Sequence, residues 1–198
     1  MTTLWAALRA LWETLRALDS AGSGRPEIAP VLLPYLAAAL TALVTGLHHR
    51  RLKARLGDWR GVWLYFALFF LLLAALPATI VSLTAAGPPG DALAALGVQA
   101  GNFRLGLPVL AVALPVVVLI GAFASRSPVM SQHYPLSRSA CSGFARLLAF
   151  EAGYVTLYYT GWEFLYRGLL FLPLLDNVGF LAAASLSTAL SVLHHIGQ

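Results

Sequence analysis

Charged residues are scarce in this chain of 198 residues. Asp, Glu, Lys and Arg together make up 11% of the sequence, whereas soluble globular domains contain about 25%. Hydrophobic residues make up 59%, and the mean hydropathy is +0.77. This composition excludes an ordinary soluble domain. It predicts an all-α, polytopic membrane protein, because backbone groups in lipid must be hydrogen-bonded within helices.

Cysteine is nearly absent as well. Cys141 is the single Cys, which excludes an internal disulfide and a cysteine-based metal site. The net charge is +5, but the basic residues lie in short loops between apolar runs and not along a surface interleaved with aromatic residues. We therefore expect a lipid bilayer as the partner and no nucleic acid. A removable signal peptide is not expected, because the first residues lack a basic region and a small-residue cleavage site.

Apolar runs recur along the chain. They cover residues 28–47, 61–84, 107–125, 143–176 and 179–195. Because one crossing takes roughly 20 apolar residues, we expect about five membrane segments within one domain, residues 28–198. Kinks are expected at four prolines: Pro34, Pro77, Pro115 and Pro173.

The fourth run is longer than a bilayer requires. As a helix, it would extend about 51 Å, so we expect it to tilt, break or protrude. Gly161 and Gly168 lie within it. They are plausible places for a break or for a close approach of another helix.

The first residues have a different pattern. Over residues 1–19, Leu and Trp recur at helical spacing with charged residues between them, which predicts an amphipathic helix. It is too short and too charged to span a membrane, so we expect it to lie in the membrane interface or to dock onto the bundle. Residues 20–27 are rich in Gly and Ser, which is typical of a linker.

Basic residues are concentrated between the first two runs. Residues 48–60 read HHRRLKARLGDWR, and the excess of Lys and Arg predicts a cytoplasmic loop. The loop before the fourth run contains Arg126, Arg138 and Arg146 without an acid, so it belongs on the same side. The turn near Gly179 then lies on the outer side.

A pair of charges interrupts the fourth run. Glu163 and Arg167 are four residues apart in WEFLYRG, and Tyr159 lies one turn earlier. On a helix these three side chains share one face. Ionisable residues within a membrane segment mark a functional site by default, although an ion pair with a structural role is the alternative.

Two adjacent histidines lie near the end of the last run. His194 and His195 follow Ser187 and Ser191. The midpoint between Glu163 and His194 falls at residue 178 or 179, so a helical hairpin turning there would bring both side chains to the same depth. A Glu and a His that meet in this way can activate water or hold a metal. By contrast, His48 and His49 at the start of the basic loop are expected to be solvated interfacial residues.

These residues resemble the CAAX-protease and bacteriocin-processing (Abi) family of intramembrane metalloproteases. The resemblance covers about residues 143–198, from Glu163-Phe-Leu-Tyr-Arg167-Gly168 to Ser-Val-Leu-His194-His195. It implies a multi-pass protein of the bacterial inner membrane that hydrolyses a peptide bond of a membrane-associated peptide or protein. Glu163 would act as base or metal partner, Arg167 would orient it, and His194 would bind a divalent metal, zinc, or the oxyanion. His195 is the fallback ligand.

The sequence departs from the family pattern at two points. Trp162 occupies the place of the first of the family's two Glu residues, and the third motif, a later His, is missing before Gln198. We therefore expect the domain to be truncated at its C-terminus. The alternative is a non-catalytic homologue, an immunity or accessory factor, in which Glu163 and Arg167 form a structural pair. A transporter or channel fragment is a third hypothesis, without repeats to favour it.

Overall fold

The computed structural model describes residues 29–84, 87–128 and 134–195. The predicted amphipathic helix at 1–19 and the linker at 20–27 lie outside these residues. All regular structure in the described ranges is helical, which confirms the predicted all-α class there.

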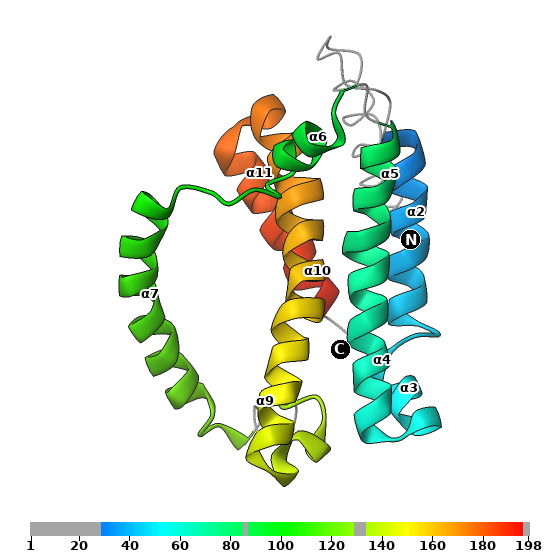
Figure 1. The fold of residues 1–198 in the computed structure, drawn as a ribbon, viewed down its shortest axis with the longest axis vertical. Helices are drawn as coiled ribbons and strands as arrows, with labels where there is room; N and C mark the ends of the chain where they lie inside the picture. The colour runs from blue at the N-terminus through cyan, green and yellow to red at the C-terminus, as the bar shows by residue number, and fades with distance from the viewer. Residues whose placement is uncertain (1–28, 85–86, 129–133, 196–198) are drawn as a thin grey trace.

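The first two apolar runs form two helices that lie side by side (Figure 1). The first is α2, Ala29–Val44. The second is one long helix made of α4 (Asp58–Phe70), the π-helical turn η1 (Leu71–Ala75) and α5 (Leu76–Thr84). The hydroxyl of Tyr35 on α2 donates to the carbonyl oxygen of Leu72 at 2.8 Å, which fixes α2 against η1.

The fourth and fifth runs form a helical hairpin. Its first arm continues through α9 (Phe144–Gly153), η3 (Tyr154–Tyr159), α10 (Thr160–Glu163), η4 (Phe164–Phe171) and the start of α11 (Leu172–His195). Gly179 within α11 has φ 77° and ψ 167°, so the chain turns back there. This is the position at which the sequence predicts the hairpin, and Figure 1 shows the second arm returning behind the first.

π-helical turns precede two of the prolines at which kinks are expected. Pro77 follows η1 and Pro173 follows η4. The backbone N–H of Leu76, just before Pro77, bonds to the carbonyl of Leu71, five residues back. A proline ring clashes with the carbonyl four residues before it, and the wider turn relieves that clash.

Close contact at glycines holds the long arm against its neighbours. A Cβ added at Gly161 would lie 3.1 Å from the carbonyl oxygen of Phe69, and one at Gly168 would lie 2.8 Å from that of Leu96. A side chain at either position would therefore meet backbone. Of the two roles expected for these glycines, the close approach is the one observed, since the helix continues through both.

Aromatic side chains fill the space between α4–η1 and the long arm. Phe66 and Phe69 are completely buried, and Tyr158 packs on both at ring-centroid distances of 5.7 and 4.3 Å. Rings of this size bury much apolar area and dominate packing energy. The core of the described structure therefore lies directly beside the WEFLYRG segment.

Helix α7, Phe103–Ala124, corresponds to the third run and packs differently. None of its residues is buried, and Figure 1 shows it bowed away from the other helices, with Pro108 and Pro115 inside it. A helix that is apolar on all sides is stable in hydrocarbon and not in water.

Two described helices are long and apolar enough to cross a membrane: Asp58–Thr84 and Phe103–Ala124. They give weak support for membrane association. The segments Pro34–Val44 and Val178–His194 are apolar but shorter. The number of crossings, about five by sequence, stays a prediction.

Short helices occupy two stretches between the apolar runs. The basic loop contains α3, His49–Leu56, and the loop after α5 contains α6, Pro89–Ala95. A 3-10 turn, η2, covers Arg138–Ser142 before α9.

Candidate functional site

The hairpin turn brings His194 back against the WEFLYRG segment. The hydroxyl of Tyr166 and Nδ1 of His194 are 2.8 Å apart, a hydrogen bond between the two arms. The Trp162 ring lies nearly parallel to the imidazole, at 18° and a centroid distance of 4.9 Å. The returning arm therefore places His194 beside Tyr166 and Trp162. The predicted meeting of His194 with Glu163 stays a prediction.

A second polar contact reinforces this pairing. The Ser187 hydroxyl, which is buried, donates to the backbone carbonyl of Tyr166 at 2.8 Å. Ser187 precedes His194 by seven residues, close to two helical turns, so the two side chains lie on nearly the same face. Two side chains of the returning arm, Ser187 and His194, are thus hydrogen-bonded to Tyr166. Together these bonds fix the position of His194 along the first arm and the rotation of its helix.

Tyr166 is the site residue that the sequence analysis missed. The midpoint of Tyr166 and His194 is residue 180, close to the turn at Gly179. The same midpoint argument that paired Glu163 with His194 could have found Tyr166. In the sequence, however, a tyrosine hydroxyl among aromatic residues is indistinguishable from ordinary packing, whereas charged residues stand out.

Glu163 and Arg167 form the expected ion pair. Nε of Arg167 lies 2.9 Å from Oε2 of Glu163. Their side chains keep 37% and 66% of their surface exposed, and Tyr159 is also exposed. Among the described residues this face is therefore open.

Trp162 lies on the buried face of the same turn. It is 8% exposed, and its ring stacks on Phe69 with an interplanar angle of 9°. Phe69 also stacks on His194, at 6.0 Å and 16°. Trp162, which stands where the family pattern has its first Glu, is therefore engaged in ring contacts with Phe69 and His194.

A zinc site is not completed by the described residues. No group of three His, Cys, Asp or Glu side chains comes together within them, whereas a catalytic zinc takes three protein ligands. The ligand set predicted from sequence consists of His194 with His195 as fallback. His195 ends α11, but its side chain lies outside what the structure describes, so its role stays a prediction.

The expectation that His48 and His49 are solvated is wrong. They are 9% and 8% exposed, and the His49 ring packs on Tyr65 at 5.5 Å. Nδ1 of His48 accepts the backbone N–H of Arg50 and caps α3. The pKa of His48 is lowered mainly by burial and further by the positive charges of Arg50 and Arg51. Sequence spacing could not predict this, because the covering Tyr65 lies on another helix.

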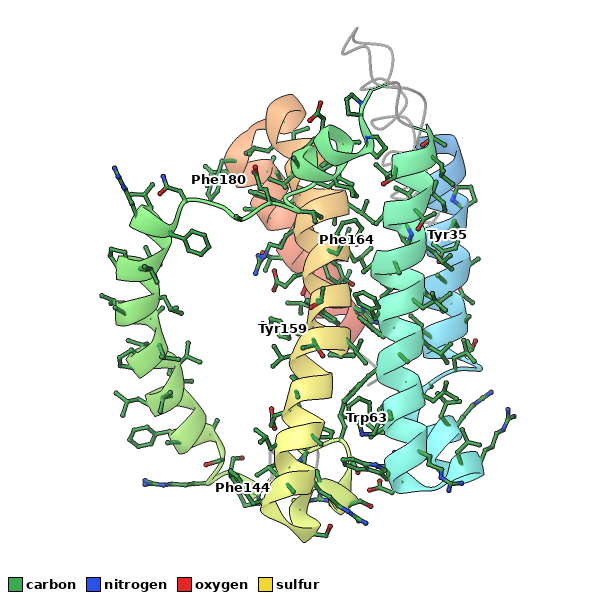
Figure 2. All side chains as sticks on the ribbon, viewed as in Figure 1. Tyr35, Trp63, Phe144, Tyr159, Phe164 and Phe180 are labelled. Carbon is green, nitrogen blue, oxygen red and sulfur yellow. The ribbon has the colours of Figure 1, made fainter. Side chains whose placement is uncertain are left out.

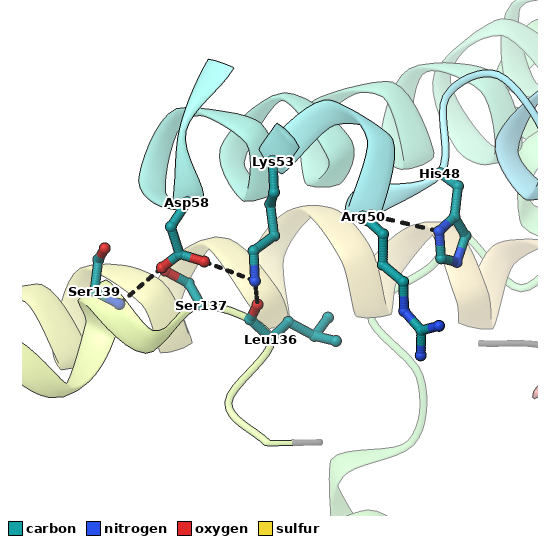
Figure 3. Close-up of polar contacts among 7 residues, drawn as sticks. All are labelled: His48, Arg50, Lys53, Asp58, Leu136, Ser137 and Ser139. Carbon is teal, nitrogen blue, oxygen red and sulfur yellow. Dashed lines mark hydrogen bonds and ion pairs between the residues drawn. The ribbon is translucent and has the colours of Figure 1, made fainter. Parts of the chain in front are cut away.

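A polar cluster ties the basic loop to the loop before α9 (Figure 3). Nζ of Lys53 lies 2.6 Å from Oδ1 of Asp58 and donates to the carbonyl oxygen of Leu136 at 2.6 Å. Oδ2 of Asp58 accepts the Ser137 hydroxyl and the Ser139 backbone N–H, at 2.6 and 2.8 Å. The two basic loops, expected on one side of the membrane, are thus joined at one end of the molecule.

Comparisons with known proteins do not identify a relative: no protein-family model, curated protein or solved structure matches the chain.

Proposed function

We propose that this protein is an intramembrane endopeptidase of a multi-pass type, situated in a bacterial inner membrane. It would hydrolyse a peptide bond of a membrane-associated peptide or protein. The observation that carries this proposal is the hydrogen bond between Tyr166 and His194. It holds an imidazole beside the helix turn that carries Glu163 and Arg167.

The chemistry assigned to these side chains is general-base catalysis. Glu163 takes a proton from water, which attacks the peptide carbonyl carbon, and the proton is then delivered to the leaving amine. Oε2 of Glu163 is held by Arg167 at 2.9 Å, which leaves Oε1 for the water. His194 serves as a donor to the developing oxyanion through Nε2. This atom is buried in the described structure, so the role requires the surrounding side chains to move when substrate binds.

The resemblance to the CAAX-protease and bacteriocin-processing family supports the same assignment through Glu163, Arg167 and His194. A divalent metal, zinc, stays part of the family-based hypothesis. Because the described residues do not supply three ligands, no step of the proposed reaction depends on it.

The test is turnover of a membrane-embedded reporter peptide by the purified full chain in vesicles. We expect Glu163→Gln and His194→Ala each to lower the rate at least about 100-fold, the range lost when a general base or an oxyanion donor is removed. Glu151→Gln is the matched control, since Glu151 is an exposed acid on the same long arm. Wild-type rates in Glu163→Gln or in His194→Ala would end the assignment.

The second candidate is a non-catalytic membrane homologue, such as an immunity or accessory factor. The burial of Trp162 between Phe69 and His194 favours it, because an apolar contact occupies the place of a family acid. In that case Glu163→Gln lowers the melting temperature and no variant changes turnover, since the wild type has none.

A further inference from the structure

Basic side chains gather at one end of the molecule. Figure 1 shows α3, the start of α9 and the last turn of α7 at the same end, opposite α6. The polar cluster around Asp58 joins α3 and α4 to residues 136–139, which precede α9. We define the basic end by its exposed arginines, which are Arg50, Arg51, Arg55, Arg60, Arg126, Arg138 and Arg146.

Several of these charges have no counter-ion in the described structure. Asp58 is already engaged by Lys53, and within the described ranges Arg51, Arg55 and Arg60 have no ion-pair partner. Arg51 and Arg55 are also four residues apart on α3, where like charges repel each other. An external anion would relieve this repulsion.

The surroundings of the basic end indicate what kind of anion it meets. Exposed apolar side chains lie within four residues of the arginines in sequence: Leu56 is 45% exposed, Leu64 38% and Phe144, labelled at the start of α9 in Figure 2, 79%. The Trp59 ring lies under the guanidinium of Arg146, at 6.0 Å. Arginine, tryptophan and exposed apolar residues together are typical of the boundary between lipid headgroups and acyl chains.

We propose that the basic end binds the phosphate headgroups of anionic phospholipids, with Arg51, Arg55 and Arg60 as the main contacts. A soluble polyanion such as RNA would neutralise the charges but leave Leu56 and Phe144 in water. A bilayer with anionic headgroups would both neutralise the arginines and cover these apolar side chains. The proposal rests on membrane insertion, which is part of the proposed function, but not on any catalytic activity.

The experiment measures lipid binding to the full chain in uncharged detergent micelles by native mass spectrometry. Binding of phosphatidylglycerol, which is anionic, is compared with binding of phosphatidylcholine, which carries no net charge. We expect wild type to prefer phosphatidylglycerol, and Arg55→Gln to weaken that binding roughly fivefold, the effect of one basic residue at a charged membrane surface. The triple variant Arg51→Gln, Arg55→Gln, Arg60→Gln should lose at least about tenfold.

The matched control is Arg104→Gln, which removes an exposed arginine at the start of α7, far from the basic end. It should bind phosphatidylglycerol like wild type, and Arg55→Lys should retain most of the affinity. An equal loss in Arg104→Gln would refute the proposal, because net charge alone would then explain binding. Competition by millimolar inorganic phosphate, or by RNA, would refute a bilayer as the ligand.

A separate measurement distinguishes failure of membrane insertion from failure of this proposal. Extraction of the protein from vesicles by alkaline carbonate would refute insertion, and lipid binding with it. Retention in the vesicles without any preference for phosphatidylglycerol would refute the lipid proposal alone.

Discussion

Burial of His49 predicts a loss of stability in mild acid. The pKa of His49 is lowered to about 4, mainly by its burial and further by the nearby His48, Arg50 and Lys53. In an unfolded chain the imidazole pKa is about 6.5. The folded state therefore binds fewer protons than the unfolded state between these values. The contribution of His49 to the free energy of unfolding is therefore fully present above pH 6.5 and is lost as the pH drops towards 4.

The two pKa values set the magnitude. A single group with these values lowers the free energy of unfolding by about 2 kcal/mol at pH 5, and by about 3 kcal/mol once fully protonated. For a chain of this length, 2 kcal/mol corresponds to a melting temperature lower by about 5 °C. His48 shifts in the same direction and adds to the effect.

The assay is thermal unfolding in detergent micelles between pH 7.5 and pH 5. His49→Gln removes the titrating group, so its melting temperature should depend less on pH than that of the wild type, whatever the substitution costs at pH 7.5. His194→Gln controls for loss of a histidine elsewhere. If wild type and His49→Gln lose the same number of degrees between the two pH values, His49 is not the group responsible.

Two further predictions concern packing and the polar cluster. Gly161→Ala should destabilise the fold by about 1–3 kcal/mol in a melting assay, because its Cβ would lie 3.0 Å from the Phe69 ring. Gly121→Ala is the control and should be neutral or stabilising, because the space around Gly121 is open. Asp58→Asn should cost about 1–3 kcal/mol, because Lys53 loses its ion pair, and a melting temperature equal to wild type would contradict this.

The long helices and the hairpin were predictable because their signals are local. Apolar runs marked the helices, and the turn lies at Gly179, where φ is positive and a residue with a Cβ would be strained. The ion pair of Glu163 and Arg167 also follows from spacing along one helix. Each of these features depends on residues close together in the chain.

The features that sequence did not predict depend on contacts between distant residues. Helix α3 lies within a stretch read as a basic loop, and its Lys53 backbone packs so closely on α4 that a Cβ at Gly61 would overlap it. His49 is buried by Tyr65 on another helix. Hydropathy also could not show that α7 stays apart while equally apolar helices pack together, since both lipid and protein cover apolar side chains.

The contact between Tyr166 and His194 bears on how the imidazole could act. If the tyrosine hydroxyl donates to Nδ1, the neutral ring carries its proton on Nε2. That atom is buried in the described structure, and it could donate to an oxyanion once the site opens to substrate. If Nδ1 donates to the hydroxyl, Nε2 has a lone pair and suits a metal ligand. ¹⁵N chemical shifts of His194 distinguish the two forms. The first result would favour the oxyanion role without zinc, and Tyr166→Phe should then allow both forms to populate.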